Sequence, residues 1–111
     1  MTTSGEKYTA MDTYANLDEF YPFYMSQHSN QTNRRLHVIG TSLALLQLLY
    51  TLLLSLTIGN LLLAVIIGYG CAWVGHFFFE KNKPATFKHP WLSLQGDFRL
   101  FKETITGQRA F

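Results

Sequence analysis

The stretch LHVIGTSLALLQLLYTLLLSLTIGNLLLAVIIGYGCAWVGHFFF (residues 36–79) decides the fold, because its 44 residues include no Asp, Glu, Lys or Arg. As a continuous helix it would extend about 66 Å, which is enough to cross the roughly 30 Å hydrocarbon core of a bilayer twice. Two crossings form a hairpin that returns to the membrane face where it began. His37 and His76 stand near the two ends of the stretch, so the sequence predicts that both lie near one membrane face.

Two membrane-spanning segments are predicted within this stretch, at residues 38–57 and 61–79. Gly59 and Asn60, which are typical of turns, separate them. Arginines precede the first segment and lysines follow the second, whereas the turn carries no charge. Because positive residues mark the cytoplasmic side of a membrane, both termini are predicted to be cytoplasmic. Residues 1–14 are polar, so no cleavable signal peptide is expected.

Three further segments flank the hairpin. Residues 1–13 are small and polar, which predicts a loose terminus. After Asn16, a typical helix cap, apolar and aromatic residues recur at helical spacing and predict a short helix at the membrane interface. Residues 90–106 predict an amphipathic helix that lies on the cytoplasmic surface and covers the hairpin. Its apolar face follows a 3, 4, 3, 4 spacing and comprises Trp91, Leu94, Phe98, Phe101 and Ile105.

The composition fits a small integral membrane protein, with 48% apolar and only 14% charged residues. We therefore predict an all-α fold with a single membrane domain over residues 1–111, in a bacterial inner membrane or the endoplasmic reticulum. A soluble protein with two core helices is the alternative, but burying both helices on all sides would need a larger protein.

The net charge of +2 comes from residues 80–111 and indicates contact with membrane lipid and not with nucleic acid, because no arginine-rich cluster is interleaved with aromatics. Two spans offer little surface to enclose a substrate, so we also expect a homo-oligomer.

All histidines of the chain are predicted to lie at the cytoplasmic boundary, and they are His28, His37, His76 and His89. Neutral imidazole binds borderline metal ions, so this set is a candidate for metal ligation. Nine residues separate His28 from His37, which is half a turn out of phase on an unbroken helix. For both to face one ion, the chain must bend near Ser29 and Asn30.

Several polar residues near the histidines are candidates for supporting roles. His76 and Glu80 are four residues apart, so the carboxylate is predicted to be a fifth ligand or the acceptor that fixes the imidazole tautomer. Asn30, Asn33 and Asp97 are candidates for the same orienting role.

Three alternatives to a non-haem metal site follow from the same residues. The histidines suit the membrane interface of a non-catalytic scaffold or lipid-binding protein. Two of them would also serve as the axial ligands of a haem. A di-iron hydroxylase is disfavoured, because such sites draw on more histidines or on several carboxylates. The sequence contains no Gly-rich phosphate loop, HExxH or GxSxG motif, and the lone Cys71 excludes an internal disulfide.

Two segments, QHSNQTNRRLHVIGT (27–41) and GHFFFEKNKPA (75–85), carry a resemblance to a known family. They resemble the small membrane dioxygenases that act on 2-hydroxy fatty acids in α-oxidation. One motif is H-x-N-x-x-N-x-x-x-H, formed by His28, Asn30, Asn33 and His37, and the other is the G-H-x-x-x-E-K-x-x-P-A run from Gly75 to Ala85. The likeness begins at about Tyr14 and covers most of the chain.

This resemblance implies a non-haem Fe(II) held by histidines, molecular oxygen as co-substrate, and a product one carbon shorter than the 2-hydroxy fatty acid. His28, His37 and His76 match the motif histidines of the family, and His89, in KHPW, matches a shorter, bacterial-like branch. Ser42 stands where eukaryotic members tend to have proline, which is a departure from the eukaryotic pattern.

The residues suit this chemistry on their own terms. An iron ion held by neutral imidazoles keeps its positive charge and open positions, where a 2-hydroxy carboxylate chelates through both oxygens. The acyl tail is expected to stay among the leucines of the spans. Arg34, Arg35 or Lys88 is expected to neutralise the carboxylate as it enters.

Overall fold

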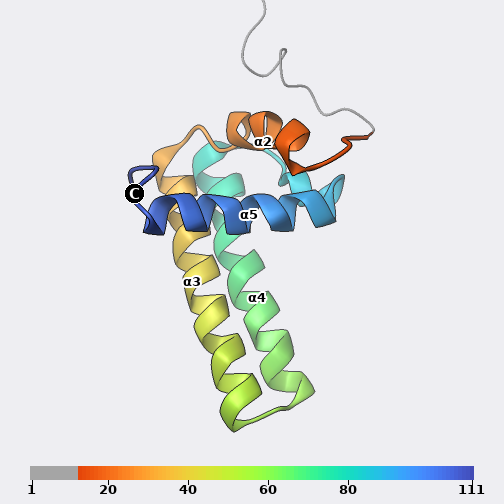
Figure 1. The fold of residues 1–111 in the computed structure, drawn as a ribbon, viewed down its shortest axis with the longest axis vertical. Helices are drawn as coiled ribbons and strands as arrows, with labels where there is room; N and C mark the ends of the chain where they lie inside the picture. The colour runs from red at the N-terminus through yellow and green to blue at the C-terminus, as the bar shows by residue number, and fades with distance from the viewer. Residues whose placement is uncertain (1–12) are drawn as a thin grey trace, which may run out of the picture.

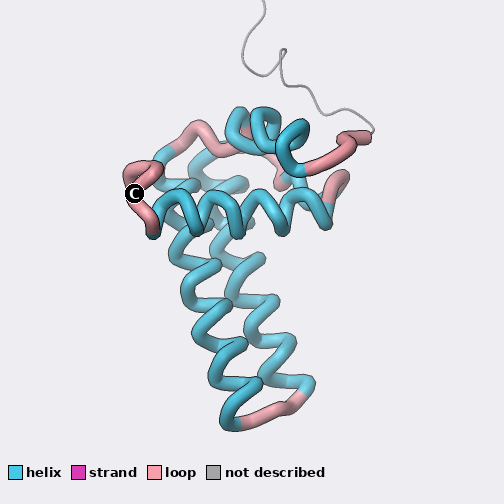
Figure 2. Tube along the Cα trace, in the orientation of Figure 1, coloured by secondary structure: helices cyan, strands magenta, loops and turns pink. Residues whose placement is uncertain are grey.

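The computed structural model describes residues 13–111, so the predicted loose terminus lies outside the described residues apart from Thr13. Within this range the fold is all-α, as predicted, and it contains no strand. A long helical hairpin forms a shaft, and two shorter helices cross one end of it and form a head (Figure 1). The tube view shows the same division, with short loops joining the helices (Figure 2). The elements are α2 (Leu17–Ser26), α3 (Gln31–Leu54), α4 (Ile58–Val74), the π-helical turn η1 (Gly75–Glu80), the 3₁₀ turn η2 (Ala85–Phe87) and α5 (Pro90–Ile105).

The turn of the hairpin lies at residues 55–57, and the prediction that Gly59 and Asn60 form it was wrong. Only three residues separate α3 from α4, because Thr57 caps α4: the Thr57 hydroxyl accepts a hydrogen bond from the Asn60 N–H at 3.1 Å. The Asn60 side chain in turn donates to the Ser55 carbonyl at 3.0 Å. Gly59 and Asn60 therefore belong to the first turn of a helix.

Small residues let α3 and α4 approach closely near the head. A Cβ atom placed on Gly40 would lie 2.6 Å from the Cβ of Cys71, and one on Gly68 would lie 3.5 Å from the Cβ of Ala44. Such contacts between small residues are typical of helices that associate inside a membrane. They fix the spacing of the two helices that carry His37 and His76.

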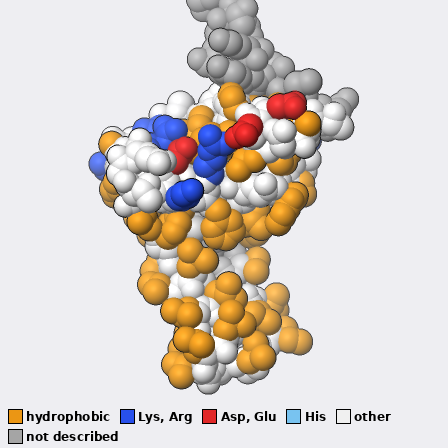
Figure 3. Space-filling model, in the orientation of Figure 1, with side chains coloured by type: hydrophobic (Ala, Val, Ile, Leu, Met, Phe, Trp, Pro, Cys, Tyr) orange, Lys and Arg blue, Asp and Glu red, His pale blue; other side chains and the backbone are white. Residues whose placement is uncertain are grey.

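The shaft is apolar on its outer surface. The helices Gln31–Leu54 and Ile58–Glu80 are long and apolar enough to cross a membrane, and only 22% of each apolar window is buried. Figure 3 shows hydrophobic side chains over the shaft and charged ones on the head. A helix in the core of a soluble protein would be mostly buried, so this exposure is evidence against the soluble alternative.

Helix α2 packs its aromatic side chains inside the head and does not leave them at a free surface. Its cap is the predicted one, with the Asn16 side chain accepting from the Glu19 N–H at 2.9 Å. Phe20 and Tyr24 are completely or almost completely buried and contact a core that includes Leu100 of α5. The aromatic periodicity therefore marks a core-facing helix.

Helix α5 occupies nearly the predicted residues but packs through a different face. Its buried positions are Ser93, Gly96 and Leu100, whereas Trp91 is 68% and Ile105 63% exposed. Gly96 explains the choice, because a Cβ atom there would lie 2.6 Å from the Tyr24 ring. The small face packs against the head and hairpin, and much of the apolar face stays uncovered by the described chain.

Candidate metal centre

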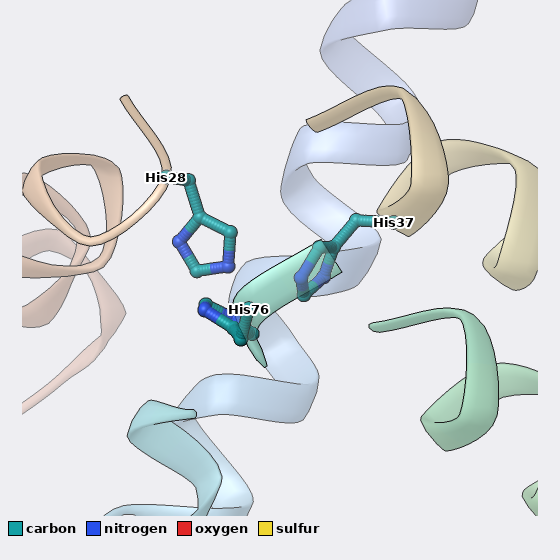
Figure 4. A group of neighbouring side chains, drawn as sticks. All are labelled: His28, His37 and His76. Carbon is teal, nitrogen blue, oxygen red and sulfur yellow. The ribbon is translucent and has the colours of Figure 1, made fainter. Parts of the chain in front are cut away.

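Three of the four histidines converge inside the head, from three different elements. His28 lies in the link between α2 and α3, His37 on the second turn of α3, and His76 on η1. Their ring centroids are 4.4 to 4.9 Å apart, and each residue offers a nitrogen within 4.8 Å of the others. All three are at least 95% buried. Figure 4 shows the rings gathered around a common space.

The break between α2 and α3 makes this convergence possible. Helix α2 ends at Ser26 and α3 begins at Gln31, with the Asn30 side chain capping the Asn33 N–H at 3.0 Å. The bend lies where the nine-residue spacing of His28 and His37 required it.

Each imidazole is oriented by an oxygen atom at its Nδ1. The acceptor is the Tyr24 carbonyl for His28, the Asp97 carboxylate for His37 and the Asn82 side-chain oxygen for His76, at 2.5, 3.0 and 2.7 Å. Since these oxygens accept hydrogen bonds, each Nδ1 carries the proton and each Nε2 carries the free lone pair. This is the arrangement in which metal-binding histidines are usually held.

The lone pairs of two histidines have no partner. Nε2 of His28 and Nε2 of His37 are buried and make no hydrogen bond to any residue in 13–111. Burial, and then the neighbouring histidines, hold the pKa of His28 well below its usual value, which favours the neutral form that binds a metal. A metal ion among the rings would satisfy these buried nitrogens, so the donor set fits the ion that the family resemblance implies.

The orienting residue of His76 is Asn82, which sequence analysis did not identify. Residues 75–80 form a π-helical turn that ends at Lys81 in the left-handed conformation, with φ of 63°. The Asn82 N–H then donates to the His76 carbonyl at 3.0 Å, which brings the Asn82 side chain to the imidazole. Six residues separate the pair, so no regular helical spacing would have indicated the contact.

Glu80 has a different role from the predicted one. Its carboxylate accepts hydrogen bonds from the Ser29 hydroxyl, the Asn30 N–H and the Asn33 side chain, at 2.6 to 3.0 Å. The predicted orienting residues Asn30 and Asn33 thus bind Glu80 and not a histidine. Together they fasten the start of α3 to the end of η1 and hold the histidine-bearing segments in register.

Asp97, on α5, connects this helix to α2 and α3. Its Oδ1 accepts from the Tyr24 hydroxyl at 2.5 Å as well as from His37. Burial, and then Asp97, raise the pKa of the Tyr24 hydroxyl, so it remains a donor. The Tyr24 ring also stacks on His28, with centroids 3.9 Å apart. The helical spacing of aromatic residues after Asn16 indicates only a packing role for Tyr24, although Tyr24 stands one helical turn before His28.

The two predicted carboxylate-binding arginines are engaged elsewhere. Arg34 donates to the carbonyls of His28 and Ser29, both at 2.8 Å. Arg35 donates to the Phe111 carbonyl at 3.1 Å and lies over the Phe111 ring. They stabilise the interhelix link and the C-terminus, and neither lines the space at the histidines.

His89, the fourth predicted ligand, is not part of the three-histidine group. It is the residue before α5, and its ring packs against Tyr14, Phe20 and Phe23 with centroids 5.1 to 6.4 Å apart. Its Nε2 is buried without a partner among residues 13–111. The aromatic side chains of α2 surround the ring because α5 starts beneath them.

Two neighbouring cavities adjoin the histidines and share part of their lining. A chamber of about 10 Å³ is lined by all three of them and by Ser93 of α5. A larger groove of about 390 Å³ runs between α3, α4 and α5 and is mostly apolar. Residues that line both cavities mark their junction, and they are His37, Tyr69, Ala72 and Asp97.

A comparison with protein families gives an independent result. The family model described as 2-hydroxy-palmitic acid dioxygenase Mpo1-like matches residues 14–109, which includes all three converging histidines. No curated protein and no solved structure matches the chain. Since the match covers most of its length, the chain belongs to the Mpo1-like 2-hydroxy-palmitic acid dioxygenase family.

Proposed function

We propose that the protein is an Fe(II)-dependent dioxygenase that cleaves 2-hydroxy fatty acids to a product one carbon shorter. The observation that carries the proposal is the group of His28, His37 and His76, with Nδ1 atoms held by acceptors and buried Nε2 atoms on His28 and His37 that lack a partner. Family membership supports the substrate class. The proposed ligands are these three histidines, and His89 is left out because it lies outside the group.

Fe(II) suits a set of neutral imidazoles, and when bound it supplies a Lewis acid with open coordination positions and the capacity to activate molecular oxygen. Asp97 and Asn82 fix the rings of His37 and His76 through Nδ1, so that Nε2 faces inward. Burial of the three rings keeps bulk water from the centre. The apolar groove offers a place for the acyl chain within the shaft.

We further propose that the shaft spans a membrane, with both termini on the cytoplasmic side. The outward apolar surface of α3 and α4 supports the spans, and the arginines and lysines that flank them support the orientation. The candidate metal centre would then lie at the cytoplasmic boundary, where the carboxylate of a fatty acid can reach the histidines while its tail stays within the apolar part of the shaft. A bacterial inner membrane and the endoplasmic reticulum both fit this arrangement.

The proposal is tested by reconstituting the detergent-purified full chain with Fe(II) under anaerobic conditions and then adding oxygen and 2-hydroxy-palmitic acid. Mass spectrometry is expected to show a product one carbon shorter. His28→Ala, His37→Ala and His76→Ala are each expected to abolish the product and lower the bound iron. His89→Gln is the matched control, expected to retain bound iron.

Each rival function predicts a different result. A non-catalytic scaffold or lipid-binding protein would bind no iron, or as much iron after His37→Ala as before. A haem protein would show Soret absorbance, whereas the chamber at the histidines has room for about one water-sized group. Either result would overturn the proposed function.

A further inference from the structure

Ser93 presents a buried hydroxyl with no partner. It is 5% exposed, its Oγ makes no hydrogen bond to any residue in 13–111, and it lines the chamber at the three histidines. Thr104, on the same helix, instead bonds the carbonyl four residues earlier, at 2.9 Å. A buried hydroxyl without a hydrogen-bond partner is unfavourable, so an oxygen of a ligand is the partner to expect.

Tyr69 supplies a second hydroxyl at the junction of chamber and groove. It lines both cavities, and its ring packs beside Trp73 with centroids 6.1 Å apart. The Tyr69 hydroxyl donates to no other residue of the described chain. A molecule that extends from the groove toward the histidines would pass beside Tyr69, because this residue lines both cavities.

The groove leads from this junction into the apolar shaft. Along α3 its lining runs from His37 to Leu48, which is about 16 Å of helix. On α4 the lining residues include Ala64 and Gly68, which add little side-chain volume to the wall of the groove. An elongated amphiphile fits this arrangement, with its polar end at the chamber and the junction and its apolar body in the groove.

We propose that Ser93 and Tyr69 bind the head of the 2-hydroxy fatty acid, while its acyl tail lies in the groove between α3, α4 and α5. One head oxygen bonds Ser93 at the wall of the chamber. Another bonds Tyr69. This inference rests on the proposed function for the identity of the ligand, and it replaces the arginines with two hydroxyls as the head contacts.

The test measures binding without iron or oxygen, so that no turnover is involved. The chain has two tryptophans, and in a Trp91→Phe background Trp73, which lines the chamber, is the only reporter of tryptophan fluorescence. The full-length protein is titrated in detergent with 2-hydroxy-palmitic acid and with 2-hydroxy-octanoic acid. Ser93→Ala and Tyr69→Phe are each expected to weaken binding of both acids about tenfold, the value of one hydrogen bond to a charged group.

A variant in the groove distinguishes the contribution of the acyl tail to binding from that of the head. Ala64→Leu fills the groove and is expected to weaken binding of the palmitic acid derivative more than that of the shorter acid. The controls are Ser42→Ala, whose hydroxyl bonds the Val38 carbonyl at 2.8 Å, and Tyr50→Phe, which is 48% exposed. Both controls are expected to bind as the parent does.

Stability distinguishes ligand binding from a structural role of Ser93. Ser93→Ala removes an unpaired buried hydroxyl, so the ligand-free variant is expected to melt at the same or a higher temperature while binding more weakly. Binding within twofold of the parent, or an equal loss in Ser42→Ala, would overturn the inference. A protein that forms no shortened product but shows these binding changes would contradict the dioxygenase proposal alone.

Discussion

At the scale of single residues, the side chains that hold the histidines are as informative as the histidines themselves. Asp97 accepts from His37 and Tyr24, and Asn82 accepts from His76. These contacts select the tautomer that leaves Nε2 available to a metal. Polar groups buried in this way are costly unless they are paired, so their partners are specific.

Asp97→Asn is expected to lower metal affinity by 10- to 100-fold, because the neutral amide is a weaker acceptor for His37 Nδ1–H. Metal affinity is measured by competition with a chelator of known strength. Asp18→Asn, which changes an exposed carboxylate paired with Arg99, is the control and is expected to bind metal as the parent does. Unchanged affinity in Asp97→Asn would show that Asp97 does not orient His37.

Asn82→Ala and Glu80→Gln are expected to give opposite patterns. Loss of Asn82 removes the acceptor of His76, so metal affinity should fall about tenfold or more. Glu80→Gln keeps that acceptor but weakens the link to Ser29, Asn30 and Asn33, so the melting temperature should fall while affinity per folded molecule stays close to that of the parent. If Glu80→Gln were the variant with the larger loss of affinity, the result would favour one of the two predicted roles of Glu80, a metal ligand or the acceptor that orients His76.

At the scale of elements, the π-helical turn η1 explains how the long apolar helix α4 delivers a histidine to a buried centre. Its wider turn ends α4 and carries His76 and the loop with Asn82. Gly75 opens η1 directly against Asn33 of α3. Turns of this kind are frequent at functional sites.

Gly75→Ala is expected to destabilise the fold, because its Cβ would lie 2.1 Å from Asn33 Oδ1. Overpacking of this size typically costs about 1–3 kcal/mol. Gly70→Ala is the matched control on the same helix, where a Cβ meets nothing within 4 Å, and alanine there should be neutral or stabilising. Thermal melting in detergent measures both, and equal melting temperatures would show that α3 and η1 are not in close contact.

The contact between α2 and α5 predicts a loss of stability in acid. Burial alone would raise the pKa of Glu103, but hydrogen bonds from Tyr21 and Arg109 outweigh it and lower that pKa below its ordinary value of 4.5. Because the pKa of Glu103 is lower in the folded protein than in the unfolded chain, the unfolded chain binds more protons as the pH falls through this range. The stability of the folded protein therefore decreases as the pH is lowered.

The melting temperature is accordingly expected to decrease from about pH 5 downward. Tyr21→Phe removes one of the hydrogen bonds and should make this decrease shallower, whereas Tyr50→Phe should leave it unchanged. Identical pH profiles for Tyr21→Phe and the parent would contradict the contribution of this contact.

At the scale of the whole molecule, the chain separates an apolar shaft from a polar head with the candidate metal centre at their boundary (Figure 3). All the residues proposed for the site come from one chain. The homo-oligomer remains a prediction, and the groove, which one chain lines from three helices, does not depend on it.

The protein is expected to stay in the membrane fraction after washing with high salt and with alkaline carbonate. Both treatments release proteins held by charge, whereas two apolar spans remain inserted. Quantification of the protein in pellet and supernatant measures this. Release into the supernatant would show that the shaft does not span a bilayer.

The all-α fold, the two long apolar helices and the bend between His28 and His37 could be predicted from the sequence, because they follow from composition and spacing along the chain. The sequence also indicated the family, through motifs that are local. The exact turn residues were missed, since Thr57 capping α4 competes with the turn preference of Gly59 and Asn60.

Only the tertiary structure decided which polar side chain meets which histidine. Asn82 reaches His76 through a π-helical turn, and Asp97 reaches His37 across 60 residues of sequence, because α5 packs through Gly96 and not through its apolar face. The packing of α2 against the start of α5 likewise places His89 among aromatic rings and outside the three-histidine group. Spacing along a helix describes neighbours on one element, whereas a buried polar site depends on how separate elements pack against one another.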